Sequence, residues 1–514
     1  MISGPRRRFV VSLAVPVVVF ILLSGCEPTS TSCDESATCA PGDGGTGQGG
    51  ASDTGSDGST CDSSKPPGED ACVIDESYGV FVSPNGSDAS GAGTRVAPYK
   101  TLAKAIASAS GKRVYACATG GSYDEMVTIG ASVSLFGGFD CSSWAYTTST
   151  TAQLKLSAPG IPLTVKASDV TIEDVRIEAT DATDPGASSI ALFASNATNL
   201  TLHRVTLKAG KGQKGTDAVP VSNYDPTLMR SDPKIAGHNA LNASGGVQQD
   251  CANLCMNSVH PTGGKGGNGA ATSPAGDGDP GTPTITPAMP AFATGLGGVR
   301  ATDATGPCSN GKQGSNAPAA AGGAGATRAG MLTANGRGIP MNGADGMIAG
   351  AGQGGGGGGG GIDAMLGGGG GGGCGGCGGA AGLGGGGGGS SFALLSFQSK
   401  ITLDACTLIA DIAGGGGKGA DGQVGQMGGF HGNGAGPGCQ GGEGGQGGQG
   451  GGGGGGAGGL SVAIGYVGAA PAQMNGAPPQ IASTPTTGGA PGIGGTPAPT
   501  KGKDGMPQAS MSLE

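Results

Sequence analysis

The stretch Val170-Thr-Ile-Glu-Asp-Val175-Arg-Ile177 decides the fold, because its pattern occurs three times in the chain. It recurs as Leu200-Thr-Leu-His-Arg-Val205-Thr-Leu207 and again, about two hundred residues later, as Ile401-Thr-Leu-Asp-Ala-Cys406-Thr-Leu408. Each copy alternates apolar and polar residues in two short segments, which is typical of strands with one buried face. One such unit cannot bury its own apolar face, whereas stacked units share a continuous core.

We expect the apolar positions of the three copies to point inward. These positions are Val170, Ile172, Val175, Ile177, Leu200, Leu202, Val205, Leu207, Ile401, Leu403, Cys406 and Leu408. The lead-in Ser188-Ser-Ile-Ala-Leu-Phe193 repeats as Ser390-Ser-Phe-Ala-Leu-Leu395, and Gly459-Leu-Ser-Val-Ala-Ile464 is a further relative. The pattern predicts an all-β fold, a parallel solenoid. An antiparallel sandwich is the alternative, but it accounts neither for the near-identical repeats nor for the large insertion between them.

The segment from Tyr78 to Ile106 resembles the entry to a known family. It holds a short apolar strand, the turn Ser83-Pro-Asn-Gly-Ser-Asp88 and the helix-forming stretch Pro98-Tyr-Lys-Thr-Leu-Ala-Lys-Ala-Ile106. In this order the elements resemble the start of pectate-lyase-like right-handed parallel β-helix proteins, in which such a helix caps the solenoid. The resemblance implies that fold for about residues 78–208 and 390–412. The remainder is similar in composition to glycine-rich surface lipoproteins of unknown function in myxobacterium-like genomes and to mycobacterial polymorphic glycine-rich (PGRS-like) proteins.

The N-terminus has the features of an export signal. Three arginines, Arg6 to Arg8, precede an apolar run from Val10 to Leu23 that is too short to span a bilayer as a helix. The run ends in Leu23-Ser-Gly-Cys26, which resembles a lipobox in which the Cys26 thiol receives the lipid. We therefore expect a lipid-anchored protein of the outer membrane or cell surface, with the membrane as a partner through that anchor.

Composition limits what the rest of the chain can do. Glycine supplies 117 of 514 residues, while aromatic residues make up 4% and charged residues 12%. The net charge of −9 argues against nucleic acid as a partner, because no basic patch is available to replace phosphate counterions. The expected divisions are a signal peptide (1–25), a flexible, disordered tether with small disulfide loops (26–76), the β-helix cap and coils (77–208), a polar then glycine-rich insertion (209–389), a returning β-helix segment (390–412), a glycine-rich loop (413–458), and a last strand with a Pro/Gly-rich tail (459–514).

The glycine tracts allow two interpretations. In the second tract Gln440, Glu443, Gln446 and Gln449 are each separated by Gly-Gly, and a period of three is what polyproline-II-type helices require. Such helices can bundle, since no side chain blocks their approach. We expect a solvated linker instead, because glycine carries the largest entropy cost of ordering. The ordered bundle, binding ice or glycan, is the alternative.

The chain has 14 cysteines, and an exported protein favours disulfides. Sequence proximity favours three pairs: Cys33 with Cys39, Cys61 with Cys72, and Cys117 with Cys141. Cys406, at an inward strand position, is expected to be the free thiol. Six others allow 15 pairings: Cys251, Cys255, Cys308, Cys374, Cys377 and Cys439. Cys251-x3-Cys255-x4-His260 and Cys374-x2-Cys377 have ligand-like spacing, but four ligands never cluster, so we expect neither a metal nor a cofactor.

Candidate catalytic residues gather near the first repeats. A polysaccharide-active enzyme needs acidic groups on one face, and the candidates are Glu173, Asp174 and Asp181 with Arg204. Solvated charges are the simpler interpretation, so we assign no catalytic residue. The expected function is structural or adhesive, in the envelope or extracellular matrix, with surface or matrix polysaccharide as the possible partner. The alternative is a polysaccharide lyase or hydrolase that uses these residues.

Overall fold

The computed structural model describes residues 61–251, 254–256, 261–272, 274–283, 294–332, 338–339, 341–363, 365–480, 486–487, 489–490 and 492–513. They belong to one compact unit, Thr60–Glu514. The predicted signal peptide, Cys26, Cys33, Cys39 and His260 lie outside the described residues. Residues 61–76, expected to belong to a disordered tether, instead form an ordered segment with the 3-10 helix η1 (Ala71–Val73).

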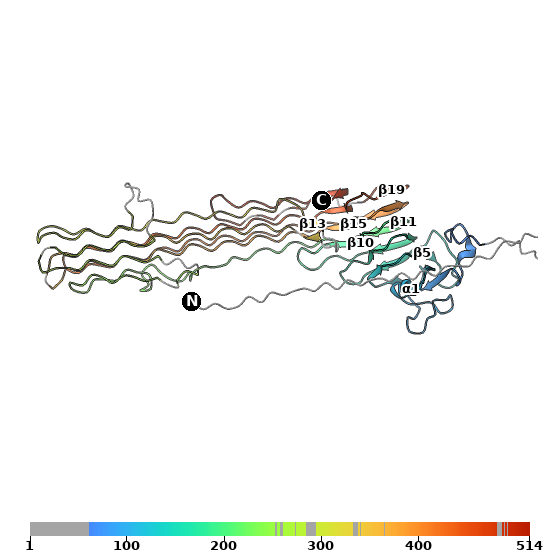
Figure 1. Cartoon of the computed structure of the whole chain (residues 1–514), viewed down its shortest axis with the longest axis horizontal. Coiled ribbons are helices and arrows are strands. Elements are labelled where there is room, and N and C mark those ends of the chain that lie inside the picture. Colours follow the sequence, from blue (N-terminus) through green and yellow to red (C-terminus); the bar gives the residue numbers. More distant parts are fainter. Residues whose placement is uncertain are drawn as a thin grey trace, which may run out of the picture. The chain divides into compact units, whose positions relative to one another are not determined.

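Parallel strands make up three sheets that lie side by side (Figure 1). The seven-stranded sheet contains, in order, β1 (Gly79–Val82), β2 (Arg113–Cys117), β5 (Ser134–Phe139), β8 (Val170–Glu173), β11 (Leu200–His203), β16 (Ile401–Asp404) and β19 (Ala472–Met474). The six-stranded sheet contains β20 (Pro507–Ser512), β18 (Ser461–Val467), β15 (Ser391–Phe397), β10 (Ser189–Ser195), β7 (Leu163–Val165) and β4 (Val127–Ile129). The five-stranded sheet contains β17 (Thr407–Ile409), β12 (Thr206–Lys208), β9 (Val175–Glu178), β6 (Ala152–Lys155) and β3 (Ser122–Tyr123). A separate antiparallel pair joins β13 (Met331–Leu332) to β14 (Gly338–Ile339).

The predicted pectate-lyase-like right-handed parallel β-helix is wrong. The strands form three open parallel sheets, none of which closes, beside the one α-helix of the described residues, and no solenoid is identified. The physical reason is that the repeat predicts which strands pair but carries no information on closure or on the hand of the connections. Val170 pairs with Leu200 and Leu200 with Ile401, in parallel register, although about two hundred residues of chain separate the last two.

The core lies between the three sheets. All of the apolar repeat positions expected to point inward, from Val170 to Leu408, are buried in one cluster, so that prediction is confirmed. Helix α1 (Leu102–Ser108) adds Leu102 and Ala105 to this cluster. The helix begins where Thr101 accepts a hydrogen bond from Lys104 N (3.1 Å), an N-cap that satisfies one of its free donors. A second cluster of aromatic residues packs around Phe81 and Trp144.

The break of register inside each repeat is a one-residue corner between two sheets. Asp174, Arg204, Ala405 and Asn475 directly follow β8, β11, β16 and β19, and their φ angles are 54°, 52°, 51° and 51°. This left-handed conformation turns the chain sharply, and non-glycine residues adopt it rarely. The corners stack through backbone bonds, for example from Arg204 N to Asp404 O (2.9 Å). Consecutive strands of one repeat therefore lie in different sheets.

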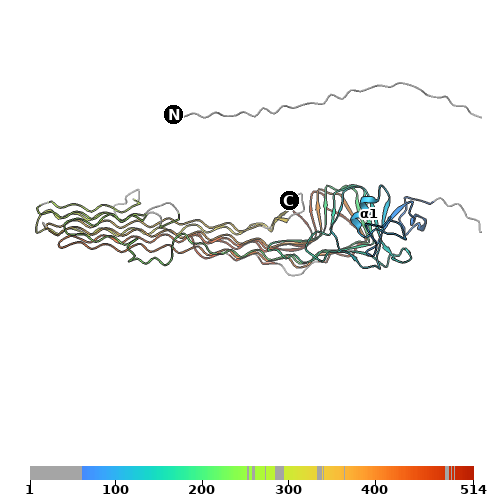
Figure 2. The same cartoon turned by 90° about the horizontal axis from the view of Figure 1, so that it is seen from below.

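Most of the remaining described chain forms what we call the glycine arm, which consists of the described residues within 209–326, 341–389, 410–460 and 486–505. Extended segments run side by side along it in two perpendicular views (Figure 1, Figure 2). Backbone hydrogen bonds join neighbouring segments at intervals of three residues. Gly352, Gly355 and Gly358 N donate to Gly376, Gly373 and Gly370 O respectively, each at 2.8 Å. A three-residue repeat without bonds inside the segment is the pattern of polyproline-II-type helices.

Glycine is required in the arm because the segments are too close for side chains. A Cβ on Gly372 would lie 1.9 Å from Gly355 O, and a Cβ on Gly444 would lie 1.7 Å from Cys374 O. Real Cβ atoms are essentially never closer than 3.0 Å to another heavy atom. The expectation of a solvated linker is therefore wrong for the described residues. The entropy cost of ordering glycine is opposed by the dense network of backbone bonds.

Some backbone N–H groups of the arm donate to polar side chains of neighbouring segments. Asn316 Oδ1 accepts from Gln446 N (2.8 Å), and Asp345 Oδ1 accepts from Gly384 N (2.7 Å). Gln426 Oε1 accepts likewise from Cys377 N (3.2 Å). These side-chain oxygens thus satisfy backbone donors that would otherwise be unpaired.

Candidate functional site

The cysteines stabilise both parts of the molecule. The structure forms Cys61–Cys72 and Cys117–Cys141, two of the three pairs that the sequence favoured. The six cysteines with open pairing join as Cys251–Cys374, Cys255–Cys377 and Cys308–Cys439, all within the glycine arm. Cys406 is free and buried, and burial raises the pKa of its thiol. The four cysteines with ligand-like spacing, Cys251, Cys255, Cys374 and Cys377, are all in disulfides, so none of them has a free sulfur for a metal.

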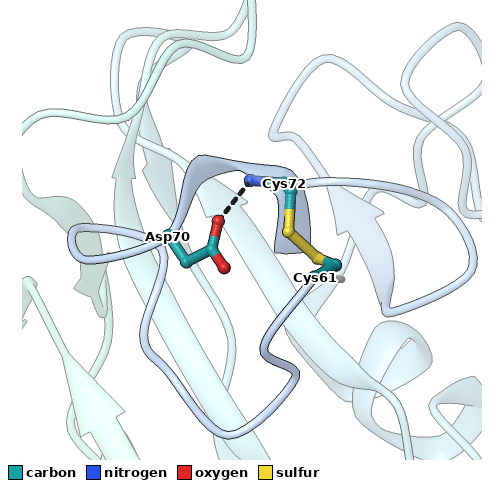
Figure 3. Close-up of side chains that lie close together, drawn as sticks. All are labelled: Cys61, Asp70 and Cys72. Atoms are coloured by element: carbon teal, nitrogen blue, oxygen red, sulfur yellow. Dashed lines mark hydrogen bonds between the residues drawn. A yellow bond between two sulfur atoms is a disulfide. The ribbon is translucent and has the colours of Figure 1, made fainter. Parts of the chain in front are cut away.

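Among the residues that the structure describes, one group of sulfur and carboxylate atoms lies close enough to hold a metal ion: Cys61, Asp70 and Cys72 (Figure 3). Both sulfurs are consumed by the disulfide between Cys61 and Cys72. Asp70 Oδ1 accepts a hydrogen bond from Cys72 N (3.1 Å), as the N-cap of η1. These donors fit a closed disulfide turn, not a metal centre.

Part of the predicted polysaccharide face belongs to a cluster of charged and polar side chains at the stacked corners, which we call the corner cluster. Its members are Tyr146, Glu173, Asp174, His203, Arg204, Asp404 and Asn475. Glu173, His203 and Asp404 end three neighbouring strands in register, and the following residue of each strand forms the corner. Parallel pairing of the repeats is what brings them together.

Arg204 organises the corner cluster. Its Nε lies 2.7 Å from Asp174 Oδ1, and its Nη2 lies 3.0 Å from Asp174 Oδ2 and 3.1 Å from Glu173 Oε2. Asp174 is completely buried, so this paired geometry offsets the cost of removing its charge from water. The hydrogen bonds with Asp174 raise the pKa of the Arg204 guanidinium further above its usual range.

Tyr146 completes the surroundings of Asp174. Its hydroxyl donates to Asp174 Oδ2 and accepts from Arg204 Nη2 (2.9 Å). Burial, together with that bond to a carboxylate, raises the pKa of Tyr146 well above its usual value. A phenol held in its protonated form donates to the buried carboxylate and cannot act as a base near neutral pH.

One of the four candidates lies elsewhere, and the single tryptophan, Trp144, packs in the core. Asp181 is exposed beyond β9, and its Oδ1 accepts from Lys211 N (2.7 Å), so it does not join the corner cluster. Trp144 is only 5% exposed, packs edge-on against Phe81 with ring centroids 4.8 Å apart, and donates from Nε1 to Arg95 O. The structure thus brings together Glu173, Asp174 and Arg204 of the four candidates.

Sequence reasoning missed part of the corner cluster. His203 lies between Glu173 (3.4 Å) and Asp404 (3.7 Å), and Asn475 Nδ2 donates to Asp404 Oδ1 (3.1 Å). His203 and Asp404 occupy the repeat position of Glu173, so aligning the repeats could have found them. The contribution of Tyr146 had no comparable signal, because it precedes the repeats.

Five turns converge at the distal end of the glycine arm, which we call the tip. Their described residues are 241–244, 270–272 with 274–276, 302–308, 362–363 with 365–367, and 434–438. Gly368 N donates to Asn242 O (3.0 Å) and Gly367 N to Ala435 O (3.0 Å), and the disulfide Cys308–Cys439 joins two further segments. Large apolar side chains are exposed there, including Met365 (79%) and Leu241 (76%).

Comparison with models of protein families, with characterised sequences and with solved structures finds no match to this chain. Within the described part of the chain, no helix has the length and apolar character to cross a membrane. The corner cluster and the glycine arm are therefore the features that bear on function.

Proposed function

We propose that this protein is a non-catalytic, lipid-anchored protein of the cell surface with a structural or adhesive role. The glycine arm would act as a stiff spacer that holds the tip away from the three sheets. The observation that carries this proposal is the close packing of the arm, in which glycine backbones bond to neighbours every third residue.

The dimensions of the arm suit a spacer. The segment from Gly438 to Leu460 runs from the tip to β18 without interruption, and at ~3.1 Å per residue it spans about 70 Å. A solvated glycine chain of equal length would instead collapse to about 25–30 Å between its ends. An ordered bundle therefore reaches further and transmits force without first unfolding.

The three arm disulfides support a mechanical role. Each joins segments more than a hundred residues apart, with sequence separations of 123, 122 and 131. Such covalent links prevent the segments from separating under load, and they require the oxidising conditions that an exported protein meets. The exposed Met365 and Leu241 at the tip offer apolar contact surface to a partner.

The corner cluster supports a structural role in preference to catalysis. Glu173 and Asp174 are 7% and 0% exposed, and both contact Arg204. A hydrolase needs one carboxyl group free to donate a proton and another free to attack or to activate water. Carboxylates that are bonded to an internal cation are better explained by stabilisation of stacked corners.

The test is a binding and cleavage screen of the full chain against acidic and neutral polysaccharides, with and without calcium. We expect the protein to bind polysaccharide without releasing oligosaccharide from it. We also expect the Glu173→Gln variant to bind as well as the unchanged protein. Released product that disappears in Glu173→Gln would show a polysaccharide-active enzyme and refute the proposal. A second experiment compares the adhesion of cells that display the unchanged chain with that of cells that display the Met365→Ser variant. We expect adhesion to be weaker for the variant. Equal adhesion would remove the tip from the proposal.

A further inference from the structure

A small pocket lies beside β20, where the glycine arm meets the six-stranded sheet. Its volume is about 150 Å³, and it is lined by residues 328–330, Leu460, residues 503–504, Met506 and residues 511–513. Backbone bonds fix these walls: Lys503 N donates to Ala326 O (2.8 Å), and Leu513 N donates to Tyr466 O (2.8 Å). The pocket is thus built from three stretches of chain that are far apart in sequence.

The pocket has an apolar wall. Leu460 is 3% exposed, and Met511 and Leu513 pack against the apolar cluster on the six-stranded sheet. Met506, at 40% exposure, completes this side. A cavity of roughly 150 Å³ has room for a molecule about the size of benzene.

The other side of the pocket is positively charged. Arg328 and Lys503 both line it, and neither side chain makes an ion pair or hydrogen bond with the residues that the structure describes. Asp504 also lines the pocket, but its Oδ1 lies 2.7 Å from Lys501 Nζ. Since Lys501 offsets that carboxylate, the two remaining cations give the pocket a net positive charge.

We propose that this pocket binds a small organic anion, a carboxylate carried on an apolar body about the size of one aromatic ring. The carboxylate lies between Arg328 and Lys503, which supply charge-assisted hydrogen bonds. The apolar body packs on Leu460 and Met511. The lining combines a few polar groups with an apolar surface, as ligand sites commonly do. This inference is independent of the structural or adhesive role proposed above.

The test uses isothermal titration calorimetry of the full chain with benzoate and with benzyl alcohol, a neutral molecule of nearly the same shape. We expect benzoate to bind at least tenfold more tightly, because only benzoate uses the two cations. In the double variant Arg328→Gln, Lys503→Gln this preference should disappear while benzyl alcohol binds as before. The matched control is Lys214→Gln, which removes an exposed lysine paired with Asp217 elsewhere in the arm and should leave benzoate binding within twofold.

Several outcomes would overturn the proposal. Absence of heat with benzoate up to 10 mM, a concentration far above the affinity of roughly 1 mM expected for so small a ligand, would exclude the site. Equal affinity for benzoate and benzyl alcohol would exclude the ionic contribution. Unchanged benzoate binding in the double variant would place the ligand elsewhere. Retained benzyl alcohol binding in that variant shows that the pocket itself remains folded.

Discussion

Replacing Gly355 in the interior of the glycine arm by alanine tests the packing most sharply, because an exposed glycine nearby provides the control. A Cβ on Gly355 would lie 2.0 Å from Gly442 O, whereas a Cβ on Gly350 would meet nothing within 4 Å. Ordinary van der Waals contact begins at 3.4 Å, so the segment around Gly442 must move by 3.4 − 2.0 = 1.4 Å. That shift breaks the bond from Gly442 N to Gly356 O, now 2.7 Å long.

The magnitude follows from the bonds that are lost. The substitution breaks two or three backbone hydrogen bonds, at about 1 kcal/mol each, and adds about 1–3 kcal/mol of overpacking. These costs exceed the stabilisation of up to ~1 kcal/mol that alanine brings by restricting the unfolded chain. Gly355→Ala should therefore lower the free energy of unfolding of the arm by about 2–5 kcal/mol. Gly350→Ala has only the stabilising effect on the unfolded chain and should raise the free energy of unfolding by about 0.4–1 kcal/mol. The two substitutions should therefore change that free energy in opposite directions.

Urea unfolding of the full chain, followed by the polyproline-II circular-dichroism band, measures both variants. The reasoning is refuted if Gly355→Ala and Gly350→Ala shift the midpoint equally and in the same direction. Equal shifts would mean that a Cβ meets the same surroundings at both positions in solution, contrary to the packing of the arm.

Three further predictions concern the corner cluster, the tip and the acid limit of stability. Asp174→Asn should lower the free energy of unfolding by about 2–4 kcal/mol, since Arg204 loses a buried charged acceptor; unchanged thermal unfolding would contradict this. Replacing both Cys308 and Cys439 by serine should cost about 2–5 kcal/mol and speed hydrogen exchange at the tip before it does so in the sheets. Burial raises the pKa of Glu178, but its hydrogen bond and charge contacts with Arg176 outweigh burial and leave that pKa lowered. Its stabilising effect is present above the unfolded pKa of about 4.3 and is lost as pH falls through the folded value, so Glu178→Gln should flatten the acid decline of the urea midpoint.

The sequence predicts strand pairing well where side chains determine it. The alternation in Val170, Leu200 and Ile401 identified neighbouring strands and their buried faces across about two hundred residues. It did not determine that the sheets stay open, because closure depends on how the connections run, and those connections lie in segments with no side-chain pattern. The corner cluster was predictable in part, since Glu173 and Arg204 belong to the repeat. Tyr146 was not, because it reaches Asp174 only through the tertiary fold.

The glycine arm could not be predicted with the same argument. Helix and strand propensities give glycine a large entropy cost of ordering, and within a single segment that is correct. The stabilisation arises only between segments, where Gly355 or Gly372 allows backbones to approach within hydrogen-bonding distance on several sides. The period of three at Gln440, Glu443, Gln446 and Gln449 was the available signal, and its meaning depends on neighbours that the sequence does not identify.

Hydrogen exchange of the full chain, resolved by mass spectrometry over residues 354–361 and 441–459, tests the central claim that the glycine arm is an ordered bundle. Nearly all of these glycines are buried, and their N–H groups bond to neighbouring segments. We predict exchange at least about a thousandfold slower than in an unstructured chain, as for cooperatively opening structure. Exchange at the rate of unstructured glycine peptides would contradict the account and return the arm to a solvated linker.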